Sequence, residues 1–338
     1  MSQVVQSITP AEQSPVSWPW LPVELVEDII AKAWSSSLTS DERIDIFTSL
    51  CLVNHTFLRL FIRIALRDVH IPSPAFASHY LRLLRERTPS EPDSDYFLEN
   101  ASSTANELCR TLIFHIDGRD PAFAPSSVRL FSARDPAAGA VGSTLYMLDI
   151  LRLCPNLRRV ALAYADWSFD DIFDHARLLL VPPQATDLEV RFAFSPGAPA
   201  RVAHALRQRY ARRGRAYWTT PNVRRLEIFG ASTEFVSDML ETCPNAEVLE
   251  TDSVEKLDML AQSPSNLHTL GLHLPNSRIH EEDVKAWRLR ESLDAGLLSA
   301  ATAPNVVMFA GHQEPAVLEH VNQICTASQT RLHHVVSF

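Results

Sequence analysis

The chain has 338 residues, of which 46% are hydrophobic and 21% charged, and its formal net charge is −9. This composition is that of a globular protein and excludes disorder over most of the length. The acidic balance argues against a protein that grips nucleic acid or an anionic membrane surface, so we expect neither as a partner. Only 9 glycines stand beside 22 prolines, which is a poor supply for phosphate-binding loops.

Residues 1–17 are polar and contain two prolines, which predicts a flexible tail. They lack the basic start and the apolar core of a signal peptide, and no stretch of the chain reaches the ~20 apolar residues of a membrane span. The five cysteines form no Cys-x-x-Cys pair, which favours small buried thiols in a reducing compartment. We therefore expect a soluble protein of the cytoplasm or the nucleus.

Residues 18–72 carry apolar stripes at the spacing of three short amphipathic helices. The first helix follows Pro22 and ends at a run of three serines. Its stripe, with Trp18 and Trp20 beside it, exceeds what a block of ~50 residues buries internally, which predicts docking on a partner. The stripe consists of Leu21, Leu25, Val26, Ile29, Ile30, Ala33 and Trp34.

The second and third helices of this block begin at recognisable caps. Thr39 and Glu42 have the spacing of a capping box, and Asn54 can cap the helix that follows it. On the second helix we expect four residues to face the core, namely Ile44, Phe47, Leu50 and Cys51.

A repeated pattern organises the region after the helical block. Residues 73–105 are expected to form a connecting helix and a linker, residues 121–142 a further loop, and residues 106–338 a domain of repeats. Each copy is a turn, usually Pro-Asn, then a short strand and a helix candidate, which predicts an α/β solenoid of parallel strands with helices outside. Clear copies start at Pro155, Pro221, Pro244, Ser265 and Pro304, and weaker ones lie near Cys109, Asp187 and Leu332.

The beginning of the helical block resembles the F-box. The family pattern is Leu-Pro-x-Glu-Leu, then an Ile/Leu pair, then a helix with Leu, Val and an aromatic residue, and it is matched over about 50 residues. The resemblance implies docking on the Skp-family adaptor of a cullin-RING ubiquitin ligase. The matching residues are Leu21, Pro22, Glu24, Leu25, Ile29, Ile30, Leu50, Val53 and Phe57.

The repeats resemble degenerate leucine-rich repeats. Their Leu-x-x-Leu-x-Leu core is present, but Ala165, Ala231 and Pro275 stand where the family has asparagine, so we expect an irregular solenoid without that internal asparagine ladder. An F-box followed by leucine-rich repeats is a known pairing. It implies a non-enzymatic substrate-recognition adaptor of an SCF-type ligase, linked through the Skp-family adaptor to a cullin, with the repeats holding a protein substrate.

Two segments of opposite charge are neighbours within the repeats. Residues 201–225 hold eight arginines and no acid, and residues 234–258 hold eight acids and one lysine. The segments pair across neighbouring repeats or are solvated, or else the arginines form a patch for an acidic partner. The candidate patch residues are Arg207, Arg209, Arg212, Arg213 and Arg215.

No motif has the spacing that catalysis or a cofactor requires. The histidines at 280, 333 and 334 lack a metal-ligand pattern, residues 139–144 lack the lysine of a phosphate loop, and Gly-x-Ser-x-Gly is missing. We therefore predict no metal, no cofactor and no enzymatic activity. Two alternatives stay open: a repeat scaffold outside ubiquitination, and a soluble hydrolase whose site is assembled only in space.

Overall fold

The computed structural model describes residues 21–36, 38–85, 101–117, 136–165, 181–194, 219–263, 266–274, 278–298 and 304–336. The chain divides into two compact units, Met1–Ile64 and Ala65–Phe338. The expected tail, residues 1–17, lies outside the described residues. Within those ranges, no helix has the length and apolar content needed to cross a membrane.

The first unit contains α1 (Val23–Ser35), α2 (Ser40–Val53) and the start of α3 (His55–Arg67). Both predicted caps are confirmed. The Thr39 hydroxyl accepts from the amide of Glu42, whose carboxylate accepts from the Thr39 amide at 2.8 Å. The side-chain oxygen of Asn54 accepts from the Phe57 amide at 3.0 Å.

The core of the first unit is built around Trp34, whose ring meets Phe61 edge-on at 5.1 Å between centroids. Arg43 is buried over the Trp34 ring and donates to two carbonyls at the end of α1. The predicted inward face of α2 is partly wrong, because Ile44 and Phe47 are exposed while Leu50 and Cys51 are partly buried. The helix α2 carries apolar residues on several sides. The side with Arg43 faces the core because its guanidinium group donates to carbonyls at the end of α1 that have no partner within that helix.

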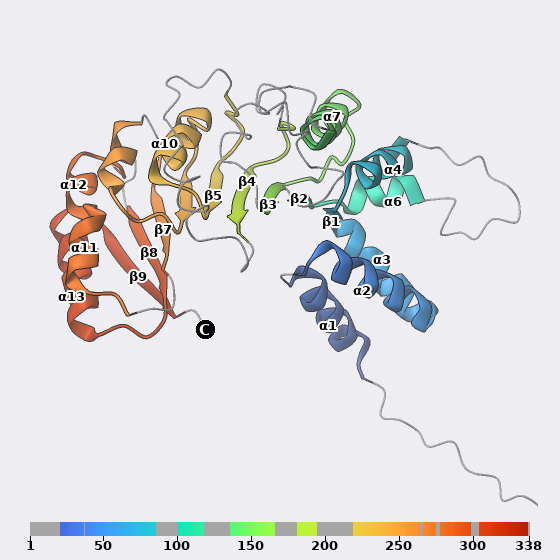
Figure 1. Ribbon diagram of the computed structural model, residues 1–338, viewed down its shortest axis with the longest axis horizontal. Coiled ribbons are helices and arrows are strands. Elements are labelled where there is room, and N and C mark those ends of the chain that lie inside the picture. Colours follow the sequence, from blue (N-terminus) through green and yellow to red (C-terminus); the bar gives the residue numbers. More distant parts are fainter. Residues whose placement is uncertain are drawn as a thin grey trace, which may run out of the picture. The chain divides into compact units, whose positions relative to one another are not determined.

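The second unit is built on a nine-stranded, all-parallel sheet whose strands follow one another in chain order (Figure 1). Every repeat copy identified in the sequence supplies one strand, which confirms the predicted stack of parallel strands. The strands are β1 (Asp68–Ile71), β2 (Thr111–Asp117), β3 (Arg159–Ala165), β4 (Asp187–Ala193), β5 (Arg225–Phe229), β6 (Val248–Thr251), β7 (Thr269–His273), β8 (Asn305–Ala310) and β9 (Arg331–Val336).

Helices of the second unit lie along one face of this sheet (Figure 1). A left-handed residue, Arg288 with φ 51°, separates α11 from α12. The helix candidate of the copy that starts at Pro244 is a short 3-10 turn, η1. The elements are α4 (Pro74–Arg85), α6 (Ala101–Leu108), α7 (Pro136–Ile150), α10 (Thr233–Thr242), η1 (Leu257–Gln262), α11 (Glu281–Trp287), α12 (Leu289–Asp294) and α13 (Pro315–Ala327).

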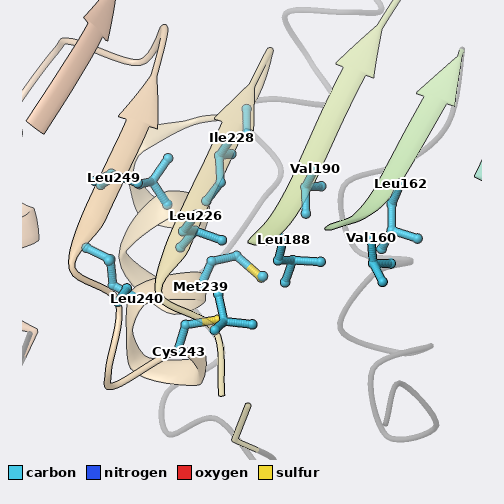
Figure 2. Packing of buried hydrophobic residues seen from close by; sticks show 14 of the residues in the cluster. Val160, Leu162, Leu188, Val190, Leu226, Ile228, Met239, Leu240, Cys243 and Leu249 are labelled. Atoms are coloured by element: carbon cyan, nitrogen blue, oxygen red, sulfur yellow. The ribbon is translucent and has the colours of Figure 1, made fainter. Parts of the chain in front are cut away.

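The core lies between the sheet and these helices. Because side chains alternate along a strand, the parallel register stacks equivalent apolar residues from strand to strand. Leu188 pairs with Leu226, which pairs with Leu249. Figure 2 shows such rows facing Met239 and Leu240 of α10 and Cys243, which follows that helix.

Three stretches differ from the expected boundaries. Residues 68–71 pair with β2 as the first strand of the sheet, so the helical block ends earlier than residue 72. Tyr80 and Leu84 of α4 are buried in the core of the second unit, so the connecting helix belongs to that unit. The expected loop ends in a helix, because α7 begins at Pro136, and the segment at 139–144 is therefore helical.

Asparagines of the Pro-Asn turns form a ladder at the entrance of the strands. Each side-chain amide donates to a main-chain carbonyl of the preceding repeat, which ties neighbouring turns together. This ladder lies before the strands, and it differs from the family's internal ladder after the strands, where Ala165 and Ala231 stand in place of asparagine. The bonds run from Asn156 to Glu107 at 2.9 Å, Asn222 to Ala185 at 2.6 Å, Asn245 to Pro221 at 2.9 Å and Asn266 to Pro244 at 3.4 Å.

Candidate interaction surfaces

The first candidate surface lies on α1 and is apolar. Leu21, Leu25 and Ile29 are 60%, 49% and 58% exposed. Leu25 and Ile29 are four residues apart and lie on one side of α1, and Leu21 lies just before the helix. We call these three residues the α1 apolar surface. Apolar side chains exposed together on one element are typical of a contact site for another protein.

The predicted F-box residues do not all share this exposure. Three more of them are exposed, namely Pro22, Glu24 and Val53. Two others, Leu50 and Phe57, are partly buried. Ile30 and Trp34 belong to the core of the first unit. Trp34 therefore packs internally, contrary to its expected place at an interface. Trp18 and Trp20 lie outside the described residues. Exposed residues that the motif did not include are Ile44, Phe47 and Leu52 of α2.

The second candidate surface lies on the face of the sheet opposite the core. Side chains of β3 to β7 form a continuous series of ion pairs and hydrogen bonds there, in which each carboxylate bridges two basic side chains. We call it the inner-face network. It comprises Arg191–Glu189 at 2.8 Å, Glu189–Arg159 at 2.7 Å, Arg159–Glu227 at 2.8 Å, Glu227–Arg225 at 2.7 Å, Arg225–Glu250, and Glu250–His273 at 2.8 Å.

The acids and the bases of the network are exposed very differently. The three glutamate side chains are 9–11% exposed, while those of Arg159, Arg225 and Arg191 are 38%, 43% and 53% exposed. The hydrogen bond from His273 lowers the pKa of Glu250, against the opposing effect of burial. Glu250 therefore stays ionised at neutral pH, and all three carboxylates lie beneath a layer of guanidinium groups.

An aromatic row continues the network toward the last strands. The Phe229 ring lies 4.9 Å beneath the Arg191 guanidinium and meets His273 edge-on at 5.0 Å. The imidazole of His273 stacks on Phe309 with 4.2 Å between centroids. We call Phe229, His273 and Phe309 the aromatic row. All three side chains are partly exposed, so a ligand can reach them.

One glycine makes the network possible. Gly271 of β7 is the neighbour of Glu250 in the register. A Cβ at Gly271 would lie 2.7 Å from the Cγ of Glu250. The Glu250 side chain therefore crosses β7 where only a glycine leaves room, and it reaches His273 from there.

The opposite charges of residues 201–225 and 234–258 predicted part of this pairing. Arg224 pairs with Glu247 at 3.1 Å, and Arg225 pairs with Glu250, so these members of the two charged segments meet across neighbouring repeats. The candidate patch at residues 207–215 lies outside the described residues. The network itself was missed, although an aligned Leu-Glu pair recurs at 188–189, 226–227 and 249–250 and marks it.

Cysteine and histidine side chains are placed within the packing. Four cysteines are buried, Cys51 is half-buried, and all five carry free thiols, as expected. His70 and His115 stack on neighbouring strands, with 2.8 Å between ring nitrogens. Among the described residues, no group of three or more His, Cys, Asp or Glu side chains could hold a metal ion.

The geometry defines two surfaces suited to contacts with other proteins, one on each unit. No protein-family model matches the sequence, and the search of curated proteins also found no match. Function must therefore be inferred from the chemistry of these surfaces and from the pattern that starts at Leu21.

Proposed function

We propose that the chain is a substrate-recognition adaptor of a cullin-RING ubiquitin ligase. In this proposal the first unit is an F-box that docks on the Skp-family adaptor, and the second unit is a leucine-rich-repeat-like solenoid that holds the substrate protein. The chain performs no chemistry itself. It raises the effective concentration of the substrate beside a charged ubiquitin-conjugating enzyme.

The observation that carries the proposal is the exposure of the α1 apolar surface. Leu21 and Leu25 are the two leucines of the Leu-Pro-x-Glu-Leu motif, and both side chains face solvent although the unit has a core of its own. Leaving three large apolar side chains in water is unfavourable unless a partner covers them. A partner helix or groove that buries them gains this free energy.

A binding assay with the full chain tests the proposal. Ile29→Asp should weaken binding of a purified Skp-family adaptor by roughly tenfold or more, because it puts a charge into an apolar contact. Leu21→Ala combined with Pro22→Ala should abolish capture in a pull-down. Ile150→Asp is the matched control, since Ile150 is 57% exposed on α7 of the other unit.

The outcomes separate the proposal from its rivals. Loss of binding with Ile29→Asp and unchanged binding with Ile150→Asp supports docking through α1. Failure of the parent chain to bind any Skp-family adaptor contradicts the proposal and favours a repeat scaffold outside ubiquitination.

A further inference from the structure

We propose that the inner face of the sheet binds an extended segment of a partner protein that carries acidic side chains next to an aromatic one. The residues that make this contact are Arg159, Arg191, Arg225, Phe229, His273 and Phe309. The inference deepens the proposed function, because it names the class of substrate. It rests on that function only in calling the bound partner a substrate.

The inner-face network exposes its arginines to a partner. The carboxylates of the inner-face network lie beneath the arginines, so the groups that a partner meets are guanidinium groups. Arg191 uses its Nε and Nη2 on Glu189, and Arg225 uses the same two nitrogens on its glutamates. Within the part of the chain that the structure describes, Nη1 of each arginine keeps its two N–H groups for a ligand.

The arginines of the network are held in place before a ligand binds. Each arginine is held by a buried carboxylate, so little side-chain freedom is lost when a ligand binds. A planar guanidinium with its outer edge exposed suits a carboxylate, which accepts two parallel hydrogen bonds. A lysine of a partner has donors and no acceptor, so it can form no hydrogen bond with these N–H groups.

Two further acidic side chains, those of Asp187 and Asp252, lie on this face and limit its positive charge. Asp187 pairs in register with Arg159 and Arg225, between them. Asp252 accepts hydrogen bonds from the Gly230 amide at 2.8 and 2.9 Å. Binding of an acidic segment therefore rests on directed hydrogen bonds to Arg191 and Arg225 and not on a large net positive charge.

The aromatic row supplies the apolar part of the contact. Phe229, His273 and Phe309 form an edge-on and then a stacked arrangement across β5, β7 and β8. An aromatic side chain of a partner can extend this stack, which contributes beyond the burial of area. From β3 to β8 the surface spans five strand spacings, about 24 Å, which equals roughly seven residues of extended chain.

An immobilised peptide array probes the purified full chain in the absence of any ubiquitin-ligase component. Peptides of about 12 residues vary acidic, basic and aromatic content independently, so that each exceeds the length that the surface spans. We expect the retained peptides to combine Asp or Glu with Trp, Tyr or Phe. For the best binder, Arg191→Gln and Phe309→Leu should each weaken binding in solution by roughly fivefold or more.

Matched control variants test whether a loss of binding results from unfolding or from a general change in charge. Arg290→Gln removes an arginine of α12 that is 68% exposed and pairs with Asp294, and Phe76→Leu removes a phenylalanine that is 41% exposed on α4. Both controls should bind like the parent, and all four variants should keep its melting temperature. The inference is overturned if basic peptides are retained as well as acidic ones, if no peptide is retained, or if the controls weaken binding equally. Adaptor binding is measured separately, so either idea can fail alone.

Discussion

The side-chain amide of Asn245 donates a hydrogen bond to the main-chain carbonyl of Pro221, 2.9 Å away and one repeat earlier. Asn222 makes the equivalent bond to Ala185 and a second one to Pro182. Carbonyl groups of the turns thereby gain donors that the strands do not supply. The Pro-Asn turn therefore recurs for a physical reason, and the same reason sets the entrance of each strand.

The ladder predicts a graded loss of stability. Asn222→Ala should cost roughly 1–3 kcal/mol, because two carbonyls lose their donor in a partly buried turn. Asn222→Asp should cost more, since a carboxylate would face those carbonyl oxygens. Asn245→Ala should cost less, because that bond is exposed. Urea unfolding measures the order, and equal stability of Asn222→Ala and the parent would show that the ladder is unimportant.

Gly271 and Glu250 should be coupled in a double-mutant cycle. Gly271→Ala should destabilise the chain by roughly 1–3 kcal/mol, because the added methyl group meets the Cγ of Glu250. In a Glu250→Ala background the same substitution should cost much less. Thermal unfolding of the four proteins gives the coupling. Equal costs in both backgrounds would mean that Glu250 does not cross β7 at Gly271.

Glu250 should also give the stability a specific pH dependence. The hydrogen bond from His273 is the largest cause that lowers the pKa of Glu250 in the folded chain. Its unfolded pKa is ~4.3, so its contribution is complete above that pH and is lost as the pH falls through the lower folded pKa. Glu250→Gln should be less stable than the parent near neutral pH, and the gap should close in acid. A gap independent of pH, in urea unfolding, would contradict this.

Thiol reactivity should separate one cysteine from the others. Burial raises the pKa of Cys243 and of Cys325 to about 12, so neither forms a thiolate at neutral pH. Cys51 is half-buried, and its pKa is raised by burial as well. We expect iodoacetamide to modify Cys51 first and the buried thiols only after urea is added, as read by peptide mass mapping. Modification of Cys243 at the rate of Cys51 would contradict the burial.

Local patterns predicted the strands well, because a Pro-Asn turn and alternating apolar residues are short-range signals. The solenoid follows from their repetition, since each strand can bury its apolar face only against its neighbours. Residues 68–71 were assigned to the helical block because a single short strand shows no repetition by itself. Its place became evident only from pairing with Thr111 and the residues after it.

Side-chain facing was harder to predict where a helix is apolar on several sides. The spacing alone predicted that Ile44 and Phe47 lie on the buried side of α2. Arg43 is buried there, because its guanidinium group reaches the carbonyl of Trp34. The inner-face network has a different origin. Its contacts between strands join residues that are 23 to 68 positions apart, and the parallel register brings these residues together. The recurring Leu-Glu pairs mark the strands, but their partners emerge only from the assembled sheet.

Calorimetric titration of a purified Skp-family adaptor into the full chain tests the central claim most directly. The account predicts an equimolar complex with a negative change in heat capacity, because Leu21, Leu25 and Ile29 leave water on binding. It also predicts that Ile29→Asp removes most of this signal while Ile150→Asp keeps it. Absence of binding heat at several temperatures, with no complex on size exclusion, would contradict the account.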